Sequence, residues 1–253
     1  MGQQSRLIYQ VKIGKTPAFY DLCIESVARY AERVSARHIV QTEPILRIAP
    51  KKSARSENAL RMGFLPIYEK ENALDYLDRY AQVLILDADV YVRESAPDIF
   101  DHNADFCGVV EREMPLTVQY FDKIRKYSQG QYGSLADVDW KWNENGAEFF
   151  NMGVMLLGDV RKYLNGQTPG QFLRRPEFER FVNGEGHWRW STDQTLLNYW
   201  VKASGMSVKN LDWKWNALYG AVRDVTPAHF VHFFLSAKMP RGGAEVPDII
   251  AGL

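Results

Sequence analysis

Short runs of apolar residues recur along the chain, and most of them are too short to form a helix. The run at residues 83–86 contains no polar position, which predicts a central strand that is buried on both faces. Comparable runs predict further strands at residues 7–11, 38–40, 105–110, 149–157 and 230–235. Together they predict the strands of one sheet.

Segments with apolar residues at the 3.6-residue helical period lie between these runs. They predict helices from Pro17, over about residues 57–65, 73–80 and 177–182, from residue 193, and around an amphipathic patch at 120–127. The first strand, helix and strand form a unit that favours parallel pairing. The alternation predicts an α/β fold with a mostly parallel central sheet flanked by helices.

Two carboxylates stand directly after the apolar run at 83–86. Asp87 and Asp89 are two positions apart, so in extended backbone they point to the same side. Two such carboxylates can bind one hard cation, and the carboxyl end of a strand is where open α/β sheets bind ligands. The spacing alone is equally compatible with an acidic strand end that caps a following turn.

Composition limits the classes of partner. The chain has 253 residues, 46% of them hydrophobic, and a formal net charge of zero, so no long-range field favours nucleic acid or an anionic membrane. Cys23 and Cys107 do not resemble a disulfide framework. With no signal peptide and no apolar stretch of membrane-spanning length, we expect a cytoplasmic protein without a membrane span.

Four short motifs follow one another in a fixed order. They are Leu86-Asp87-Ala88-Asp89-Val90, Phe150-Asn151-Met152-Gly153-Val154, Asp193-Gln194, and His232 followed by Lys238 and Pro240. Together they resemble the GT-A glycosyltransferases, and within them family 8, which includes glycogenin and bacterial lipopolysaccharide sugar transferases. The resemblance implies a single GT-A domain over 1–253, with a nucleotide-binding half at 1–110, an acceptor-binding half at 111–240 and a tail at 241–253.

Three positions depart from the family pattern. Leu235 stands where the family has a glycine, Met239 separates Lys238 from Pro240, and Thr195 replaces a usual acidic residue. We therefore expect a divergent member.

The resemblance implies transfer of a sugar from a nucleotide-diphosphate donor, expected to be a UDP-sugar, to a glycan or another hydroxyl acceptor, with retention. It implies that Asp87, Asp89 and His232 bind Mn²⁺ or Mg²⁺, a cation that neutralises charge on the leaving diphosphate. Carboxylate oxygens suit both metals, and the imidazole favours Mn²⁺. A lone histidine on an apolar strand is more often a core residue, but its spacing to Lys238 and the upstream acidic pair favour a ligand.

The same resemblance assigns roles at the donor. Asp87 would lie nearer the nucleotide and Lys238 would contact the phosphates. Asp193 would contact the donor sugar and Gln194 would lie near the reacting carbon, although Asp193 is equally able to complement a helix dipole.

The base of the donor would lie near Tyr9 and Lys12. Arg61 resembles a family arginine that reaches the donor, and the alternative for it is a solvated helix face.

Asn151 interrupts an otherwise apolar strand. An unpaired buried amide would cost about 1–3 kcal/mol, so we expect a partner, which is either a sugar hydroxyl or a neighbouring loop. Gly153 indicates that something packs closely against this strand.

Six of the seven tryptophans fall into three Trp-basic-Trp triplets, at 140–142, 188–190 and 213–215. If extended, each triplet would present both indoles on one face, and aromatic faces suit sugar rings. We hypothesise that at least one triplet lines the acceptor site, against the alternative that they fill the core. Asn216 is a further candidate for the donor or acceptor edge.

Gln194 is a poor nucleophile, and no carboxylate is placed at the anomeric carbon by the sequence. A same-face route in which the leaving phosphate deprotonates the acceptor is therefore expected. Two other functions compete: a metal-dependent phosphatase or nucleotidyltransferase, and a catalytically inactive glycan-binding relative.

Overall fold

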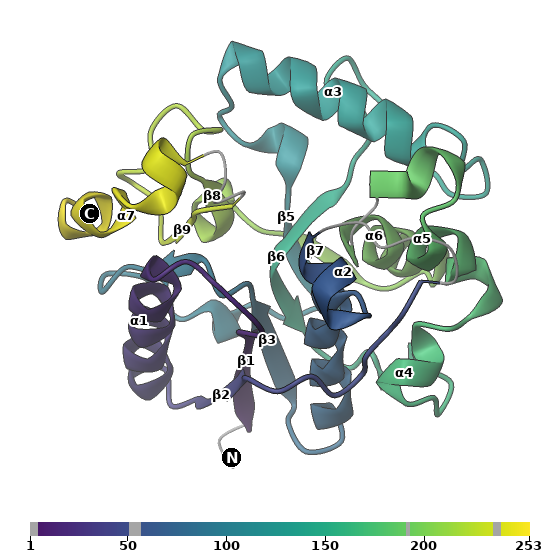
Figure 1. The fold of residues 1–253 in the computed structure, drawn as a ribbon, viewed down its shortest axis with the longest axis horizontal. Coiled ribbons are helices and arrows are strands. Elements are labelled where there is room, and N and C mark those ends of the chain that lie inside the picture. The colour runs from purple at the N-terminus through teal and green to yellow at the C-terminus, as the bar shows by residue number, and fades with distance from the viewer. Residues whose placement is uncertain (1–4, 51–56, 191–192, 235–238) are drawn as a thin grey trace.

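The computed structural model describes residues 5–50, 57–190, 193–234 and 239–253 (Figure 1). Within them, six strands form a central sheet in the order β2-β1-β3-β6-β5-β7. The strands are β1 Arg6–Val11, β2 Arg37–Gln41, β3 Gln82–Leu86, β5 Phe106–Val110, β6 Phe150–Leu157 and β7 Val208–Asn210. Strand β6 runs antiparallel to both of its neighbours, and the other pairings are parallel. The predicted α/β class and mostly parallel sheet are confirmed.

Helices cover this sheet where the sequence has the helical period. The α-helices are α1 Phe19–Arg33, α2 Glu57–Met62, α3 Val118–Tyr132, α4 Pro169–Phe172, α5 Glu179–Asn183, α6 Asp193–Ala203 and α7 Val246–Ala251. In α1, Phe19, Cys23, Val27 and Tyr30 are buried at this spacing. In Figure 1, α1 lies on the side of β1 and β2, whereas α4, α5 and α6 lie on the opposite side.

A second, smaller sheet joins three short strands that are distant in sequence. It comprises β4 Val90–Val92, β9 Phe230–His232 and β8 Ala217–Leu218, in the order β4-β9-β8. Strand β9 pairs antiparallel with β4, with Val90 opposite His232. This pairing places the histidine next to the acidic stretch that follows β3.

Two predicted elements differ from the structure. Instead of an α-helix over 73–80, the chain forms a 3₁₀ helix, η1, at Pro66–Tyr76. Seven of its residues are buried, and Glu69 accepts hydrogen bonds from the backbone N–H groups of Ile45, Leu46 and Arg47. These contacts on all sides outweigh the local preference for a regular α-helix. The strand predicted over 230–235 ends at His232, and Leu235 lies outside the described residues.

The last residues are more ordered than the tail predicted for 241–253. They include α7, in which Val246 is fully buried. A Cβ added to Gly243 would approach the ring of Phe19 within 2.6 Å, which shows how closely this segment packs against α1. Among the described residues, no helix combines the length and apolarity needed to cross a membrane.

Candidate active site

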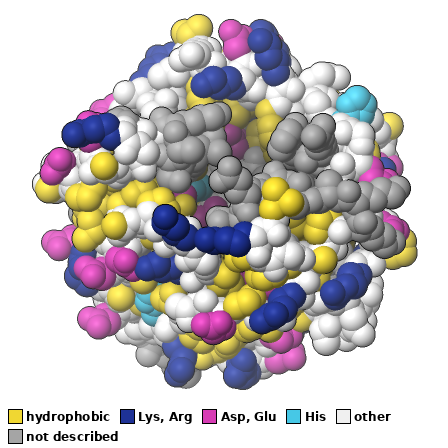
Figure 2. Space-filling model, in the orientation of Figure 1, with side chains coloured by type: hydrophobic (Ala, Val, Ile, Leu, Met, Phe, Trp, Pro, Cys, Tyr) yellow, Lys and Arg dark blue, Asp and Glu magenta, His cyan; other side chains and the backbone are white. Residues whose placement is uncertain are grey.

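A cleft of about 740 Å³ opens where β3 ends, between the central sheet, the small sheet and α3. Its lining includes six of the predicted site residues: Asp87, Asp89, Asn151, Asp193, Gln194 and His232. On the face shown in Figure 2, acidic and basic side chains are interspersed and form no field of one sign, in line with the zero net charge.

Asp87, Asp89 and His232 form a potential metal-binding group. One ligand atom from each lies within 4.8 Å of the others. The His232 Nε2 is 3.2 Å from Asp89 Oδ1 and 3.8 Å from Asp87 Oδ2. Two carboxylate oxygens and one imidazole nitrogen are a donor set that fits Mn²⁺, so this group is compatible with the predicted site.

The two carboxylates also determine the charge of the histidine. Burial disfavours the imidazolium, but the carboxylates of Asp89 and Asp87 outweigh burial and raise the pKa of His232 above its ordinary value. Tyr20, from α1, donates a hydrogen bond to Asp89 Oδ2 at 3.2 Å and fixes its orientation.

Gly153 provides the space that His232 needs. A Cβ built on this glycine would lie 2.2 Å from Cε1 and 2.6 Å from Nδ1 of the imidazole. The close packing predicted at this position is therefore the approach of the His232 ring to β6.

Lys70 lies at the centre of the cleft's charges, and the sequence analysis missed it. Its Nζ is 2.8 Å from Asp87 Oδ1, 2.6 Å from Asp193 Oδ2 and 2.8 Å from the Met152 carbonyl oxygen. Burial lowers the pKa of this ammonium group, but the carboxylates of Asp193 and Asp87 outweigh burial. The pKa is therefore raised above its ordinary value, and the group stays charged. Lys70 lies between the helices predicted at 57–65 and 73–80, and a lysine in such a connecting segment is ordinarily exposed, so the pattern gave no signal for it.

Glu111 is a second residue that the sequence analysis missed. It directly follows β5 and is buried at the cleft, where its Oε2 accepts hydrogen bonds from Asn151 Nδ2 at 3.2 Å and Gln194 Nε2 at 3.4 Å. Burial raises the pKa of this carboxyl to about 7. Its position at the carboxyl end of a predicted strand, like that of Asp87, was an available signal.

The start of α6 is fixed against β6. The side chain of Asn198 accepts from the Phe150 N–H at 2.7 Å and donates to the Phe150 carbonyl oxygen at 2.8 Å. These bonds hold Asp193 and Gln194 at the cleft, and Gln194 Oε1 accepts from the Met152 N–H at 3.3 Å. The predicted partner of Asn151 is a protein group, because its amide contacts Glu111 and Asn216.

Three other predicted donor residues, Tyr9, Lys12 and Arg61, are not among the residues that line this cleft. The Tyr9 side chain is buried, and its hydroxyl contacts Gln41 and accepts from Asn72. Lys12 pairs with Asp21. Arg61 lies beside the loop that follows β1, where its Nη2 would be 3.5 Å from a Cβ on Gly14. Lys238 is outside the described residues.

The tryptophan triplets are not extended, so the condition under which their indoles would share a face is not met. In two of them an aspartate turns the chain: Asp139 accepts from the Lys141 N–H and Asp212 accepts from the Lys214 N–H, each at 2.9 Å. The third lies in a 3₁₀ helix, Gly186–Trp190.

The described indoles differ in their exposure and contacts. Trp140 and Trp215 are buried, Trp142 is 44% exposed, and Trp188 donates to the Gln131 carbonyl oxygen. Of the tryptophans whose side chains the structure describes, none lines the cleft. Asn216 is fully buried behind the cleft rather than at its edge.

Comparisons with known proteins give matches only at the level of structure. No family model and no curated protein matches the sequence. The galactosyltransferase LgtC, solved in complex with donor and acceptor sugar analogs, is similar over 90% of this chain and 87% of its own, at 15% identity and a TM-score of 0.53.

Two further structures have TM-scores of 0.48, which is too low to support an inference about this chain. One is a glycosyltransferase involved in the glycosylation of the major capsid of PBCV-1, at 15% identity over 98% of this chain and 100% of that one. The other is mouse xyloside xylosyltransferase 1, at 14% identity over 94% and 99%. At the identity of LgtC, similarity establishes the fold alone. The chain therefore has a GT-A glycosyltransferase fold.

Proposed function

We propose that this protein is a metal-dependent glycosyltransferase that moves a sugar from a nucleotide-diphosphate donor, a UDP-sugar, to a hydroxyl of a glycan or glycoconjugate. The observation that carries the proposal is the convergence of Asp87, Asp89 and His232 on one point of the cleft, in a chain with this fold. A bound Mn²⁺ or Mg²⁺ would supply positive charge to the diphosphate leaving group. Membership of family 8 is part of the same proposal.

Lys70 and its two carboxylates organise the donor side. The ammonium group bridges Asp87 and Asp193, which ties the metal-binding group to the start of α6. We assign Asp193 to the hydroxyls of the donor sugar. The sugar contact expected for Asn151 is not part of this proposal, because its amide already has Glu111 and Asn216 as partners. Tyr9, Lys12 and Arg61 remain proposed contacts for the base end, and Lys238 remains proposed for the phosphates.

One face of α3 forms the proposed acceptor wall. Tyr120, Lys123, Ile124 and Tyr127 follow the helical spacing i, i+3, i+4, i+7 and line the cleft. Tyr219 and Phe234 also line it. Aromatic faces with a few polar groups are suited to a sugar ring. We therefore propose that α3, rather than a tryptophan triplet, lines the acceptor site.

We propose transfer with retention by a same-face route. The bond from the anomeric carbon to the leaving phosphate breaks, the acceptor oxygen bonds to the same face, and its proton passes to a phosphate oxygen. Glu111 supports a competing double displacement, since this carboxyl lines the cleft next to Gln194. Mass spectrometry of the protein quenched during turnover decides: a glycosyl group on Glu111 would exclude the same-face route.

We also propose a cytoplasmic location. Both cysteines, Cys23 and Cys107, are buried free thiols, the state that a reducing compartment maintains.

The test of function is a screen of nucleotide sugars for Mn²⁺-dependent hydrolysis by the wild type, Asp89→Ala and the control Asp248→Ala, which changes an exposed position on α7. We expect turnover of one donor by the wild type and the control and loss in Asp89→Ala. Full activity in Asp89→Ala, or in the presence of a chelator, would contradict the proposal. Phosphate release without sugar transfer would favour a phosphatase, and binding without turnover an inactive relative.

A further inference from the structure

A chain of four buried polar side chains runs behind the cleft, from the end of β5 to the metal-binding group. Asn151 Nδ2 donates to Glu111 Oε2 at 3.2 Å, Asn216 Nδ2 donates to Asn151 Oδ1 at 2.9 Å, and His232 Nδ1 is 3.0 Å from Asn216 Oδ1. All four residues are at most 7% exposed. They come from four different elements, so the chain exists only in the folded protein.

Backbone groups fix which way each amide points. The Gly153 N–H can only donate, and it lies 3.1 Å from the Asn151 side chain, so the atom that it meets is the oxygen. The Asn151 carbonyl oxygen can only accept, and it lies 3.3 Å from the Asn216 side chain, so that atom is the nitrogen. Neither amide can be reversed without placing like groups together.

This orientation determines the tautomer of the histidine. With its nitrogen turned to Asn151, Asn216 presents its oxygen to His232, and an amide oxygen can only accept a hydrogen bond. The proton of the neutral imidazole must therefore lie on Nδ1. Its lone pair then lies on Nε2, the atom that faces Asp87 and Asp89.

We infer that Glu111, Asn151 and Asn216 form a relay of hydrogen bonds that locks His232 with its proton on Nδ1 and directs Nε2 to the metal. These three are positioning residues, and every bond in the relay donates toward Glu111. Metal-binding histidines usually donate their other N–H to a carboxylate or a carbonyl, which orients the ring and raises its basicity. Here two amides span the distance to the carboxylate.

The inference rests on the metal site of the proposed function, and two measurements separate them. The first is the tautomer of His232 in the metal-free protein, read from long-range ¹⁵N–¹H correlation spectra at a pH where the imidazole is neutral. The spectrum of a His232→Gln variant identifies the resonance among the five histidines. A proton on Nδ1 supports the relay, whereas a proton on Nε2 overturns it, whether or not the protein binds metal.

The second measurement is Mn²⁺ affinity, from the free-ion signal in electron paramagnetic resonance titrations. Asn216→Leu removes the acceptor for His232, and we expect its affinity to fall about 10–100-fold, as for other outer partners of metal ligands. The matched control is Gln82→Leu, which removes a buried amide at the far end of β3, where it donates to the His102 carbonyl oxygen. Equal affinities for these two variants would overturn the relay.

Glu111→Gln keeps an acceptor for Asn151 but removes the charge at the end of the relay. It should weaken Mn²⁺ binding in the same direction and less than Asn216→Leu, and it serves if the leucine variant does not fold. Unchanged Mn²⁺ affinity in this variant would exclude a contribution of the carboxylate charge. A wild type that binds no Mn²⁺ would overturn the proposed metal site, and the tautomer would then decide the relay alone.

Discussion

Single buried charges at this cleft should contribute strongly to the free energy of unfolding, and Lys70 is the clearest case. It is the cation between Asp87 and Asp193, and both Lys70 and Asp193 are almost fully buried. Lys70→Met would leave the Asp193 carboxylate without its counter-charge. Removal of one partner of a buried ion pair costs about 3–5 kcal/mol, which urea unfolding should show as a lower free energy of unfolding.

Two further variants test whether this loss comes from the unpaired charge. The double variant Lys70→Met with Asp193→Asn should recover part of the stability, because no buried carboxylate then lacks a partner. Arg125→Met breaks the exposed pair with Asp122 and should change the free energy of unfolding by about 0–1 kcal/mol. A Lys70→Met variant as stable as the wild type would show that the bridge is unimportant for stability.

Glu111 should make stability depend on pH. Its pKa is raised from 4.5 to about 7 by burial, so the folded state binds this proton more tightly than the unfolded state. The stabilising contribution is fully present below pH 4.5 and is lost as the pH rises through about 7. The linkage corresponds to about 3 kcal/mol.

Glu111→Gln removes that dependence. Its free energy of unfolding relative to the wild type should therefore increase between pH 4.5 and 8, as measured by urea titrations at each pH. Glu144→Gln, at an exposed loop position, should follow the wild type at every pH. Parallel curves for Glu111→Gln and the wild type would mean that the buried carboxyl keeps an ordinary pKa in the fold.

At the scale of elements, local patterns were sufficient to predict the strands. The composition of the candidate site, in contrast, depends on contacts between segments that are distant in the sequence. The apolar run at 83–86 is a strand because burial on both faces requires it, and all of β3 is buried. His232 reaches Asp89 only through the pairing of β4 with β9, which no local pattern specifies. Without the resemblance, the histidine could not have been assigned to the metal-binding group.

Other differences have the same origin. Lys70 lies in a segment for which no helix was predicted, but the chain forms η1 there, and Lys70 is buried in it. The aspartates before Trp140 and Trp213 were visible turn signals, and they outweighed the extended conformation that alternating aromatics favour. Local side-chain hydrogen bonds thus determine the backbone conformation of these two triplets.

The contact of β6 with β9 gives a prediction at this scale. Gly153→Ala would place a methyl group 2.2 Å from Cε1 of His232, so the ring or the strand must move. We expect loss of Mn²⁺ binding and a destabilisation of about 1–3 kcal/mol, as for other overpacked cores. Isothermal titration calorimetry and urea unfolding measure the two effects.

The control is Gly130→Ala in α3, where an added Cβ meets nothing within 4 Å. It should bind Mn²⁺ like the wild type and should be slightly more stable, since alanine favours a helix over glycine. Retained Mn²⁺ affinity in Gly153→Ala would show that His232 does not need its observed position.

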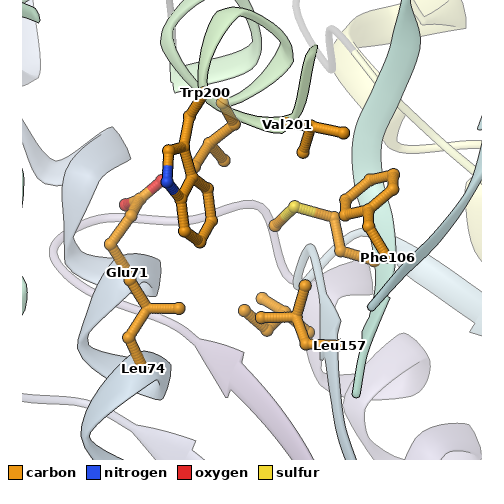
Figure 3. Close-up of a pocket in the computed structure, with 9 residues that line it drawn as sticks. Glu71, Leu74, Phe106, Leu157, Trp200 and Val201 are labelled. Atoms are coloured by element: carbon orange, nitrogen blue, oxygen red, sulfur yellow. The ribbon is translucent and has the colours of Figure 1, made fainter. Parts of the chain in front are cut away.

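At the scale of the whole molecule, buried carboxyl groups lie near one another on several elements. The carboxyl group of Glu71 and the indole nitrogen of Trp200 belong to residues that line a small cavity of about 10 Å³ beneath α6 (Figure 3). Among the described residues, neither group has a hydrogen-bond partner. Burial and the Asp193 carboxylate raise the pKa of Glu71 well above its ordinary value.

At the cleft itself, the carboxylates of Asp87 and Asp89 converge on one point, and a bound cation should relieve the repulsion between their charges. A ligand that binds only the folded state stabilises it by about 2.7 kcal/mol at 100 times its Kd. For a chain of this size, that corresponds to a rise in Tm of about 5–10 °C. Differential scanning fluorimetry with increasing Mn²⁺ measures the shift.

Asp89→Ala should abolish the rise, because the variant loses one of the three ligand atoms that lie within 4.8 Å of one another. Asp248→Ala, on exposed α7, should keep it. The difference between the two variants separates specific binding from general screening, since screening by Mn²⁺ would raise the Tm of both variants alike. Equal shifts in the wild type and Asp89→Ala would therefore locate the stabilising cation away from Asp87, Asp89 and His232.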